Sequence, residues 1–176
     1  MRWTKSFAMA VLLFGPCCFG QAPPNATTGK PTTSNPVFSI TIDPPASPIR
    51  LGSPINVTVT MTNIGGEEIY LASDKGPKAK YMGLTFLLMK SGREIETTVL
   101  HRKISGRQRP DDPEEVEHGS SIVLSYPPGT IFARTIDLKQ LYQITQPGLY
   151  TLDVSRFDDY SKTIVRSKTL TLNIVP

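Results

Sequence analysis

The sequence is poor in the residues that cross-link proteins or carry out catalysis. Its 176 residues contain two cysteines, one tryptophan and two histidines, and only 19% of them are charged. Both cysteines and the tryptophan fall within the first 18 positions. Composition therefore excludes a disulfide-rich mini-protein, a collagen, a coiled coil and a wholly disordered chain. The length allows one domain of ordinary size with a core large enough to fold without disulfides.

Motifs that carry chemistry are also missing. The sequence has no Gly-x-Ser-x-Gly turn, no His-Glu-x-x-His and no EF-hand loop. One candidate metal site combines His101 and His118 with the acidic stretch between them. Clustered acidic residues that lack the spacing of metal ligands are usually part of the solvated surface, however. The paired acids Asp158 and Asp159 fall at an expected hairpin tip, where acidic residues favour turns. We expect no catalytic residue, no metal and no cofactor.

The first twenty residues have the order of an export signal. A basic start (Arg2 and Lys5) precedes an apolar run over 7–14, and small residues follow up to Gly20. This order predicts a signal peptide over 1–20 and a secreted or periplasmic protein. The apolar run is too short to cross a bilayer, which takes about 20 residues. Lipid attachment through one of the two adjacent cysteines and a buried N-terminal helix are the alternatives.

Removal of that leader changes the charge of the chain. It takes away two of the 19 basic residues, so the net charge falls from +4 to +2. Nucleic-acid binding then has no electrostatic footprint, and no transmembrane segment is expected in the mature chain. Residues 21–36 are rich in Pro and Thr and hold no large apolar side chain. They predict a flexible linker ahead of a domain over 37–176.

From residue 37 onward, apolar and polar residues alternate. In the clearest strand, 55–62, every second residue is apolar. Such alternation predicts one buried and one solvated face, as in an antiparallel sheet. Further strands are expected at 37–43, 67–72, 81–90, 94–100, 121–126, 130–138, 149–156 and 163–175. One helical turn is expected over 139–144 and a long charged loop over 101–120, with no other helix. Short strands between Gly and Pro turns are typical of a β-sandwich.

The segment Asp137–Val154, DLKQLYQITQPGLYTLDV, resembles the corner before the penultimate strand of immunoglobulin-like domains. In that resemblance Pro147, Gly148 and Tyr150 form a structural corner, in which the tyrosine hydroxyl ties the turn to upstream backbone. Residues 56–66, NVTVTMTNIGG, resemble the second strand and following turn of bacterial modules of this type. The resemblance implies an all-β, immunoglobulin-like antiparallel β-sandwich of about 7–9 strands with no disulfide.

The order of these motifs is also similar to accessory domains of secreted deuterolysin-like metalloproteases and to the bacterial intracellular proteinase-inhibitor family. Because the sequence stops one residue after the last expected strand, the resemblance implies a stand-alone module. Sandwich folds host many functions. We expect a non-enzymatic binding or structural module of the cell envelope. The alternatives are a protease inhibitor, with Gly76–Lys80 or the 101–120 loop as its reactive loop, and a small metal-dependent hydrolase.

The charges of the 101–120 loop indicate where a partner binds. Residues 75–109 carry nine basic residues and two acidic ones, whereas residues 110–117 carry five acidic residues and no basic one. Segregated charge either folds against itself or presents a two-signed surface. We expect that this loop presents a two-signed surface to an unidentified protein or to an anionic envelope polymer. The alternative is a loop whose charges neutralise one another and which has no function. The expected binding residues are Arg102, Lys103, Arg107, Arg109, Asp111, Asp112, Glu114, Glu115 and Glu117.

Overall fold

The computed structural model describes residues 35–45, 48–74, 80–113 and 121–176, all within a unit that spans 33–176. Several sequence-based expectations lie outside these residues. They concern the leader over 1–20 with both cysteines, the linker as far as residue 34, most of the loop Gly76–Lys80, His118, and the binding residues Glu114, Glu115 and Glu117. Among the described residues, no helix has the length and apolar character needed to cross a membrane.

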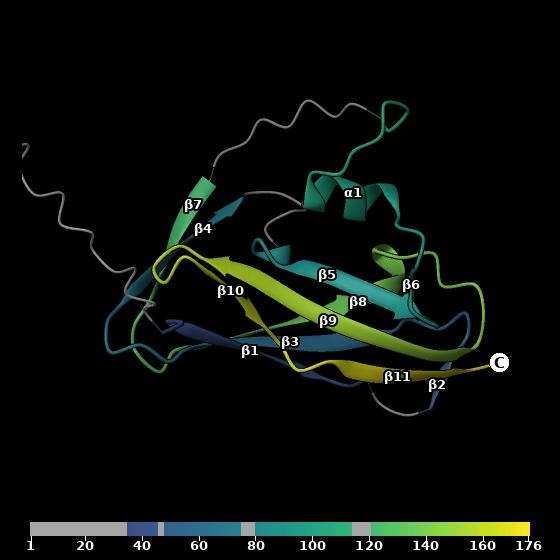
Figure 1. Cartoon of the computed structure of the whole chain (residues 1–176), viewed down its shortest axis with the longest axis horizontal. Coiled ribbons are helices and arrows are strands. Elements are labelled where there is room, and N and C mark those ends of the chain that lie inside the picture. Colours follow the sequence, from purple (N-terminus) through teal and green to yellow (C-terminus); the bar gives the residue numbers. More distant parts are fainter. Residues whose placement is uncertain (1–34, 46–47, 75–79, 114–120) are drawn as a thin grey trace, which may run out of the picture. The chain divides into compact units, whose positions relative to one another are not determined.

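The described chain is all-β with one short helix (Figure 1). Its strands are β1 (Phe38–Asp43), β2 (Ile49–Arg50), β3 (Asn56–Asn63), β4 (Ile69–Asp74), β5 (Thr85–Lys90), β6 (Arg93–Glu94), β7 (Ser121–Tyr126), β8 (Ile131–Asp137), β9 (Gly148–Asp158), β10 (Thr163–Arg166) and β11 (Leu170–Val175). The helical elements are α1 (Val99–Ser105) and the 3-10 turn η2 (Leu138–Gln140). These eleven strands exceed the nine expected because the two-residue strand β2 was not predicted and the last expected strand is split.

The strands form three sheets. One has the order β1-β3-β8, and the second has the order β2-β11-β9-β5-β6, with β10 also pairing with β9. The third is the two-stranded ribbon β4-β7. Every pairing is antiparallel except that of β11 with β2. The expected all-β class is therefore confirmed.

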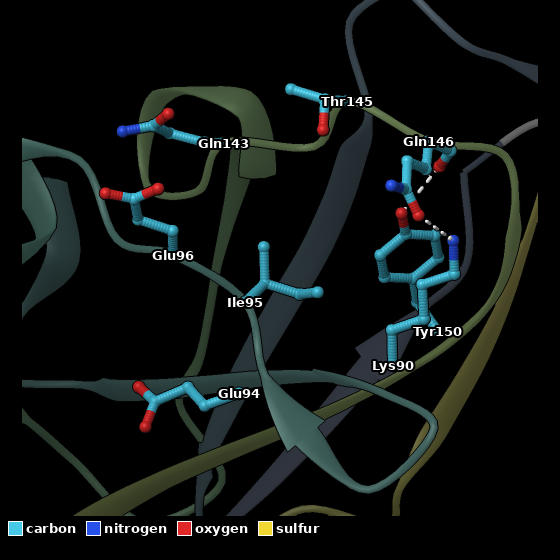
Figure 2. A pocket seen from close by; sticks show the side chains of 8 residues that line it. All are labelled: Lys90, Glu94, Ile95, Glu96, Gln143, Thr145, Gln146 and Tyr150. Carbon is cyan, nitrogen blue, oxygen red and sulfur yellow. Dashed lines mark hydrogen bonds between the residues drawn. The ribbon is translucent and has the colours of Figure 1, made fainter.

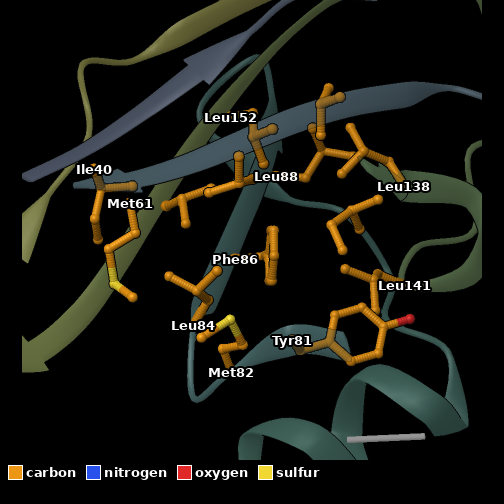
Figure 3. Packing of buried hydrophobic residues seen from close by; sticks show 14 of the residues in the cluster. Ile40, Met61, Tyr81, Met82, Leu84, Phe86, Leu88, Leu138, Leu141 and Leu152 are labelled. Atoms are coloured by element: carbon orange, nitrogen blue, oxygen red, sulfur yellow. The ribbon is translucent and has the colours of Figure 1, made fainter. Parts of the chain in front are cut away.

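The first two sheets contribute to one hydrophobic core. In β3 the apolar residues of the alternating pattern, Val57, Val59 and Met61, are all buried, as predicted. Figure 3 shows Met61 in the same cluster as Leu88 of β5 and Leu152 of β9. Burying one such side chain contributes about 1.5–3 kcal/mol. Since neither cysteine lies among the described residues, apolar burial is the main force that holds this part of the chain together.

Two expected strands are shorter than predicted because turns and a helix interrupt them. The strand expected over 81–90 begins at Thr85, since Met82 and Gly83 have positive φ angles of 49° and 66° and form a turn. The strand expected over 94–100 ends at Glu94. Helix α1 then occupies the end of that segment and the first part of the expected 101–120 loop.

The strand expected over 163–175 is broken by a bulge. Arg166 lies opposite Ser155 and Leu170 lies opposite Leu152, so three residues of this strand face two residues of β9. The Ser167 hydroxyl takes the place of a backbone acceptor and receives the Val154 N–H at 3.1 Å. A bulge of this kind bends the strand and redirects its side chains.

A buried carboxylate organises the turn between β9 and β10, at the position where a hairpin tip was expected. Asp158 is fully buried, and it accepts hydrogen bonds from the Val37 N–H at 3.0 Å and the Ser161 hydroxyl at 2.6 Å. Burial raises the pKa of Asp158, but its hydrogen bonds from Ser161, Val37 and Tyr160 lower the pKa by more, so the carboxyl titrates below its ordinary value. This side chain joins the start of β1 to the end of β9.

The Thr-Asn-x-Gly turn after β3 is held by one buried amide. The Asn63 side chain donates to the Glu67 and Tyr126 carbonyl oxygens, both at 2.8 Å, and its oxygen accepts the Gly65 N–H at 2.9 Å. Asn63 is 2% exposed, so water cannot replace these partners. The turn fixes the point at which the β3-β8 ladder gives way to the β4-β7 ribbon.

We predict that Asn63→Ala destabilises the fold by about 2–3 kcal/mol, because it removes three hydrogen bonds made by a buried side chain. Urea unfolding followed by circular dichroism measures the change. The matched control is Asn56→Ala, at an exposed position at the start of the same strand, which we expect to change stability by less than about 0.5 kcal/mol. Equal midpoints for the two variants would contradict the assignment.

Candidate functional site

Helix α1 is short, and capping residues define both of its ends. The Thr98 hydroxyl accepts the His101 N–H at 3.2 Å, and it donates to the Gln140 carbonyl at 2.7 Å. Gly106 closes the helix in the left-handed conformation, at φ 69°. A threonine at the N-cap and a glycine after the last turn are the favoured residues at these positions. The helix is therefore fixed to η2 at its start and turns sharply into the next segment at its end.

An ion pair folds that next segment back onto the helix. Arg102 donates through Nε to Asp112 at 2.8 Å, makes a second contact with the same carboxylate through Nη2, and donates to the Thr97 carbonyl at 2.7 Å. Asp112 also accepts the Arg109 N–H at 2.9 Å. The hydrogen bonds from Arg102 and Arg109 lower the pKa of Asp112 far below its ordinary value. The two side chains are 11% and 3% exposed. Contrary to expectation, neither is free to meet a partner, because each is the other's partner.

The remaining basic residues of this segment line a hollow. Arg107 and Arg109 are exposed, and Arg107 lies 3.6 Å from Glu94. With Arg102 and the extended segment Glu94–Thr97 they surround a hollow of about 340 Å³. Of the other expected binding residues, Asp111 is exposed and Lys103 is half-buried. The structure thus brings Arg107 and Arg109 together beside two glutamates, Glu94 and Glu96, that sequence analysis did not select.

A second hollow, of about 260 Å³, is lined in part by the same extended segment (Figure 2). It shares Glu94, Ile95 and Glu96 with the first, and its opposite wall consists of Lys90, Gln143, Thr145, Gln146 and Tyr150. The shared segment is held firmly, since the Ile95 N–H donates to Leu88 and the Gln143 N–H donates to Glu96, both at 2.9 Å. The two hollows therefore share a firmly held segment that carries two carboxylates.

The expected structural corner forms the far wall of this second hollow. The Tyr150 hydroxyl donates to the Gln146 carbonyl at 2.5 Å, which ties the turn to upstream backbone. Lys90 donates to the Pro147 carbonyl at 2.8 Å and lies over the Tyr150 ring. Gly148 has a φ of 138°, and a Cβ there would come within 3.1 Å of the Lys90 side chain. Tyr150 is 2% exposed, so it acts as a support of the hollow rather than as its lining surface.

A buried histidine and tyrosine connect α1 to the edge of β5. The Tyr142 hydroxyl donates to the Phe86 carbonyl at 2.7 Å and accepts the Leu88 N–H at 3.2 Å. His101 Nε2 lies 3.2 Å from that hydroxyl and 3.3 Å from the Phe86 carbonyl. Burial lowers the pKa of His101, and the charges of Arg107 and Arg102 lower it slightly further. The hydrogen bond to Phe86 and the charge of Glu94 raise this pKa, but the net effect is a lowering. Its role here is packing and backbone pairing.

No metal centre is present in the part of the chain that the structure describes. Nowhere in that part do three or more His, Cys, Asp or Glu side chains gather as metal ligands would. His101, one member of the only candidate metal site in the sequence, is 3% exposed, and its Nδ1 has no partner there.

Sequence analysis missed the segment that the two hollows share. Glu94 and Glu96 fall two positions apart in an extended segment, so their side chains share one side of it, and this spacing was the available signal. Gln143 and Gln146 lie in the segment of the corner motif, but a role was predicted only for its Pro-Gly-x-Tyr residues. The pairing of Arg102 with Asp112 across ten positions has no sequence signature.

No family model matches the sequence, and no curated protein matches it. Among solved structures, β-glucosidase from Listeria innocua is similar, in complexes with glucose and with isofagomine, each with a TM-score of 0.38 and 13% identity. The alignments cover 79% and 78% of this chain. This chain corresponds to only 16% of the length of those chains. A likeness at this level supports no conclusion about fold, substrate or activity.

We predict that Tyr150→Phe costs about 1–2 kcal/mol of stability, because the Gln146 carbonyl loses a largely buried donor. Denaturant unfolding monitored by fluorescence measures it. Tyr70→Phe is the control, since Tyr70 is 54% exposed and its hydroxyl bonds only to the nearby Glu68 side chain. An unchanged midpoint for Tyr150→Phe would show that the hydroxyl does not secure the corner.

We also predict that stability falls as the pH drops below about 6.5, the ordinary pKa of histidine. The unfolded chain binds a proton at His101 more readily than the folded chain, because burial lowers the folded pKa of this residue. The associated stability is full above that pH and is lost on acidification, with a slope of at most about 1.4 kcal/mol per pH unit. Unfolding midpoints between pH 7.5 and pH 5 measure it.

In that range the His101→Gln variant should show a flatter slope than the wild type. The carboxyl groups with lowered pKa, Glu68, Asp112 and Asp158, titrate below this window. The same slope in wild type and His101→Gln would assign the pH dependence to another group.

Proposed function

We propose that this chain is a non-enzymatic, exported binding module of the immunoglobulin-like type, and that it binds a partner protein through Arg107 and Arg109. The fold part of the proposal is supported by two sheets that enclose one core and by the Tyr150 hydroxyl bond to Gln146. The path of the chain from β1, in one sheet, to β2, in the other, also fits this type. The export part rests on the leader expected over 1–20.

The observation that carries the binding proposal is the ion pair between Arg102 and Asp112. It fixes both ends of the turn that bears Arg107 and Arg109, because Asp112 also accepts the Arg109 N–H. Charged loops normally lose entropy when a partner orders them, and a loop that is already ordered avoids much of that cost. The arginines therefore form a prepared surface instead of a solvated tail.

The surface fits a protein partner better than a uniformly anionic polymer. Glu94 and Glu96 line the same hollow as the arginines. These carboxylates would repel a polyanion, whereas a protein surface can place acids opposite Arg107 and Arg109 and bases opposite the glutamates. Charges of both signs fix the orientation of the partner and speed its association.

We predict that Arg107→Glu/Arg109→Glu lowers the association rate of the partner by about tenfold or more, and that the wild-type rate falls with added salt. The partner is first captured by cross-linking the wild-type chain in extracts of the cells that encode it. It is then purified, and its association is measured at low and high salt. The double variant keeps Arg102 and Asp112, so it should fold normally.

The matched control is Arg50→Glu/Lys162→Glu, which makes the same charge change at two exposed positions outside the hollow. A partner that binds both double variants equally well would place the contact elsewhere on the domain. If the captured protein is a secreted protease that the chain inhibits, the inhibitor alternative replaces this proposal. The N-terminal sequence of the exported chain tests the leader separately.

A further inference from the structure

A groove of about 380 Å³ lies between β1 and the β10-β11 strand, away from the two hollows. These strands belong to different sheets. The groove is lined by Ile40, Thr41, Ile42, Arg166, Lys168, Thr169 and Leu170. Its wall is thus apolar at the isoleucines and at Leu170, and cationic at Arg166 and Lys168. In Figure 1, β1 and β10 run close to one another at this edge of the domain.

The register shows that β1 directs unpaired backbone groups to this groove. In β3, Asn63 directs its N–H and C=O to the β8 side, since it donates to Thr130 and accepts from Gly129. Backbone groups alternate along a strand, so Thr60 faces β1 and pairs there with Thr41. Ile40 and Ile42 then face the opposite edge. Within the described residues, no strand pairs with that edge of β1.

The bulge at 167–169 sets the charge of the opposite wall. Arg166 and Lys168 are both exposed, and no acidic side chain among the described residues forms an ion pair with either of them. Asp153, in the stretch of β9 opposite the bulge, accepts the Thr169 hydroxyl at 2.6 Å. Two cations without a counter-charge beside a free strand edge favour an anionic occupant.

We propose that the edge of β1 binds an extended acidic segment of a partner protein, which adds as a further strand and places its carboxylates against Arg166 and Lys168. Strand addition draws its affinity from the backbone bonds and its specificity from alternate side chains. The chain's own residues 21–36 do not suit the groove, because they hold four prolines, one lysine and no acid. A second copy paired edge to edge would bring four cations together.

The test uses the full chain and a synthetic probe, acetyl-Thr-Val-Glu-Val-Glu-Val-Thr-amide, with the Glu→Lys peptide as its charge-reversed match. Calorimetry measures the affinity, and amide hydrogen exchange read by NMR locates the site. We expect the acidic peptide to bind and the lysine peptide to bind at least about tenfold more weakly. On binding, the amides of Ile40 and Ile42 should become protected, whereas that of Thr41, already paired with β3, should not change.

Arg166→Glu/Lys168→Glu should weaken the acidic peptide at least about tenfold, and Arg107→Glu/Arg109→Glu should not. If the first variant does not fold, Arg166→Gln/Lys168→Gln provides the same comparison with a smaller loss. Absence of binding, binding that survives charge reversal, or protection that spares Ile40 and Ile42 would overturn the proposal. A dimer in sedimentation whose formation protects these two amides would assign the edge to a second copy and overturn it as well.

Discussion

The edge of β5 is closed by side chains where a neighbouring strand would otherwise be required. Tyr142 receives the Leu88 N–H and donates to the Phe86 carbonyl, as the backbone of a paired strand would. A buried backbone group without a partner costs as much as a lost hydrogen bond, so this edge must be satisfied before anything can pack on it. His101 packs against the same tyrosine, with ring centres 4.9 Å apart, and so docks α1 there. The helix, the Arg102–Asp112 pair and the arginine hollow all depend on that docking.

The charged loop combines the two possibilities that its sequence left open. Part of its charge folds against itself, because Arg102 and Asp112 are paired and largely buried. The rest faces outward, because a pair at the base of the turn leaves Arg107 and Arg109 on its outer side. The charges of one segregated segment can therefore divide between internal pairing and an outward-facing surface. An internal pair can be the support that makes neighbouring charges available to a partner.

The expectations that were confirmed depend on short-range patterns. Alternation in β3 predicts its buried face, since the strand has one covered side along its whole length. The Tyr150 contact could be anticipated because it spans only four residues and begins in a recognisable Pro-Gly turn. These contacts need little knowledge of the rest of the chain.

The expectations that were wrong depend on longer-range contacts. Helix α1 has seven residues, too few for helical periodicity to outweigh the apolar alternation before it, and its caps are single residues. The partner of Arg102 lies ten residues away and meets it only because the helix ends at Gly106. The split of the last expected strand depends on which residues of β9 face it, and this register is fixed by tertiary packing.

The edge strands β8 and β1 differ in how readily another strand can pair with them. On β8 the Arg134 guanidinium stacks on Phe132, 4.1 Å from the ring centre, and also donates to the adjacent Ala133 carbonyl. Charge along an edge discourages pairing with other chains. On β1 the backbone of Ile40 and Ile42 faces outward, while prolines at positions 36, 44 and 45 bracket the strand. Since proline cannot donate to a ladder, these residues confine any added strand to the length of β1. An edge that is open for six residues and blocked beyond them suits a short partner segment and resists continued edge-to-edge assembly.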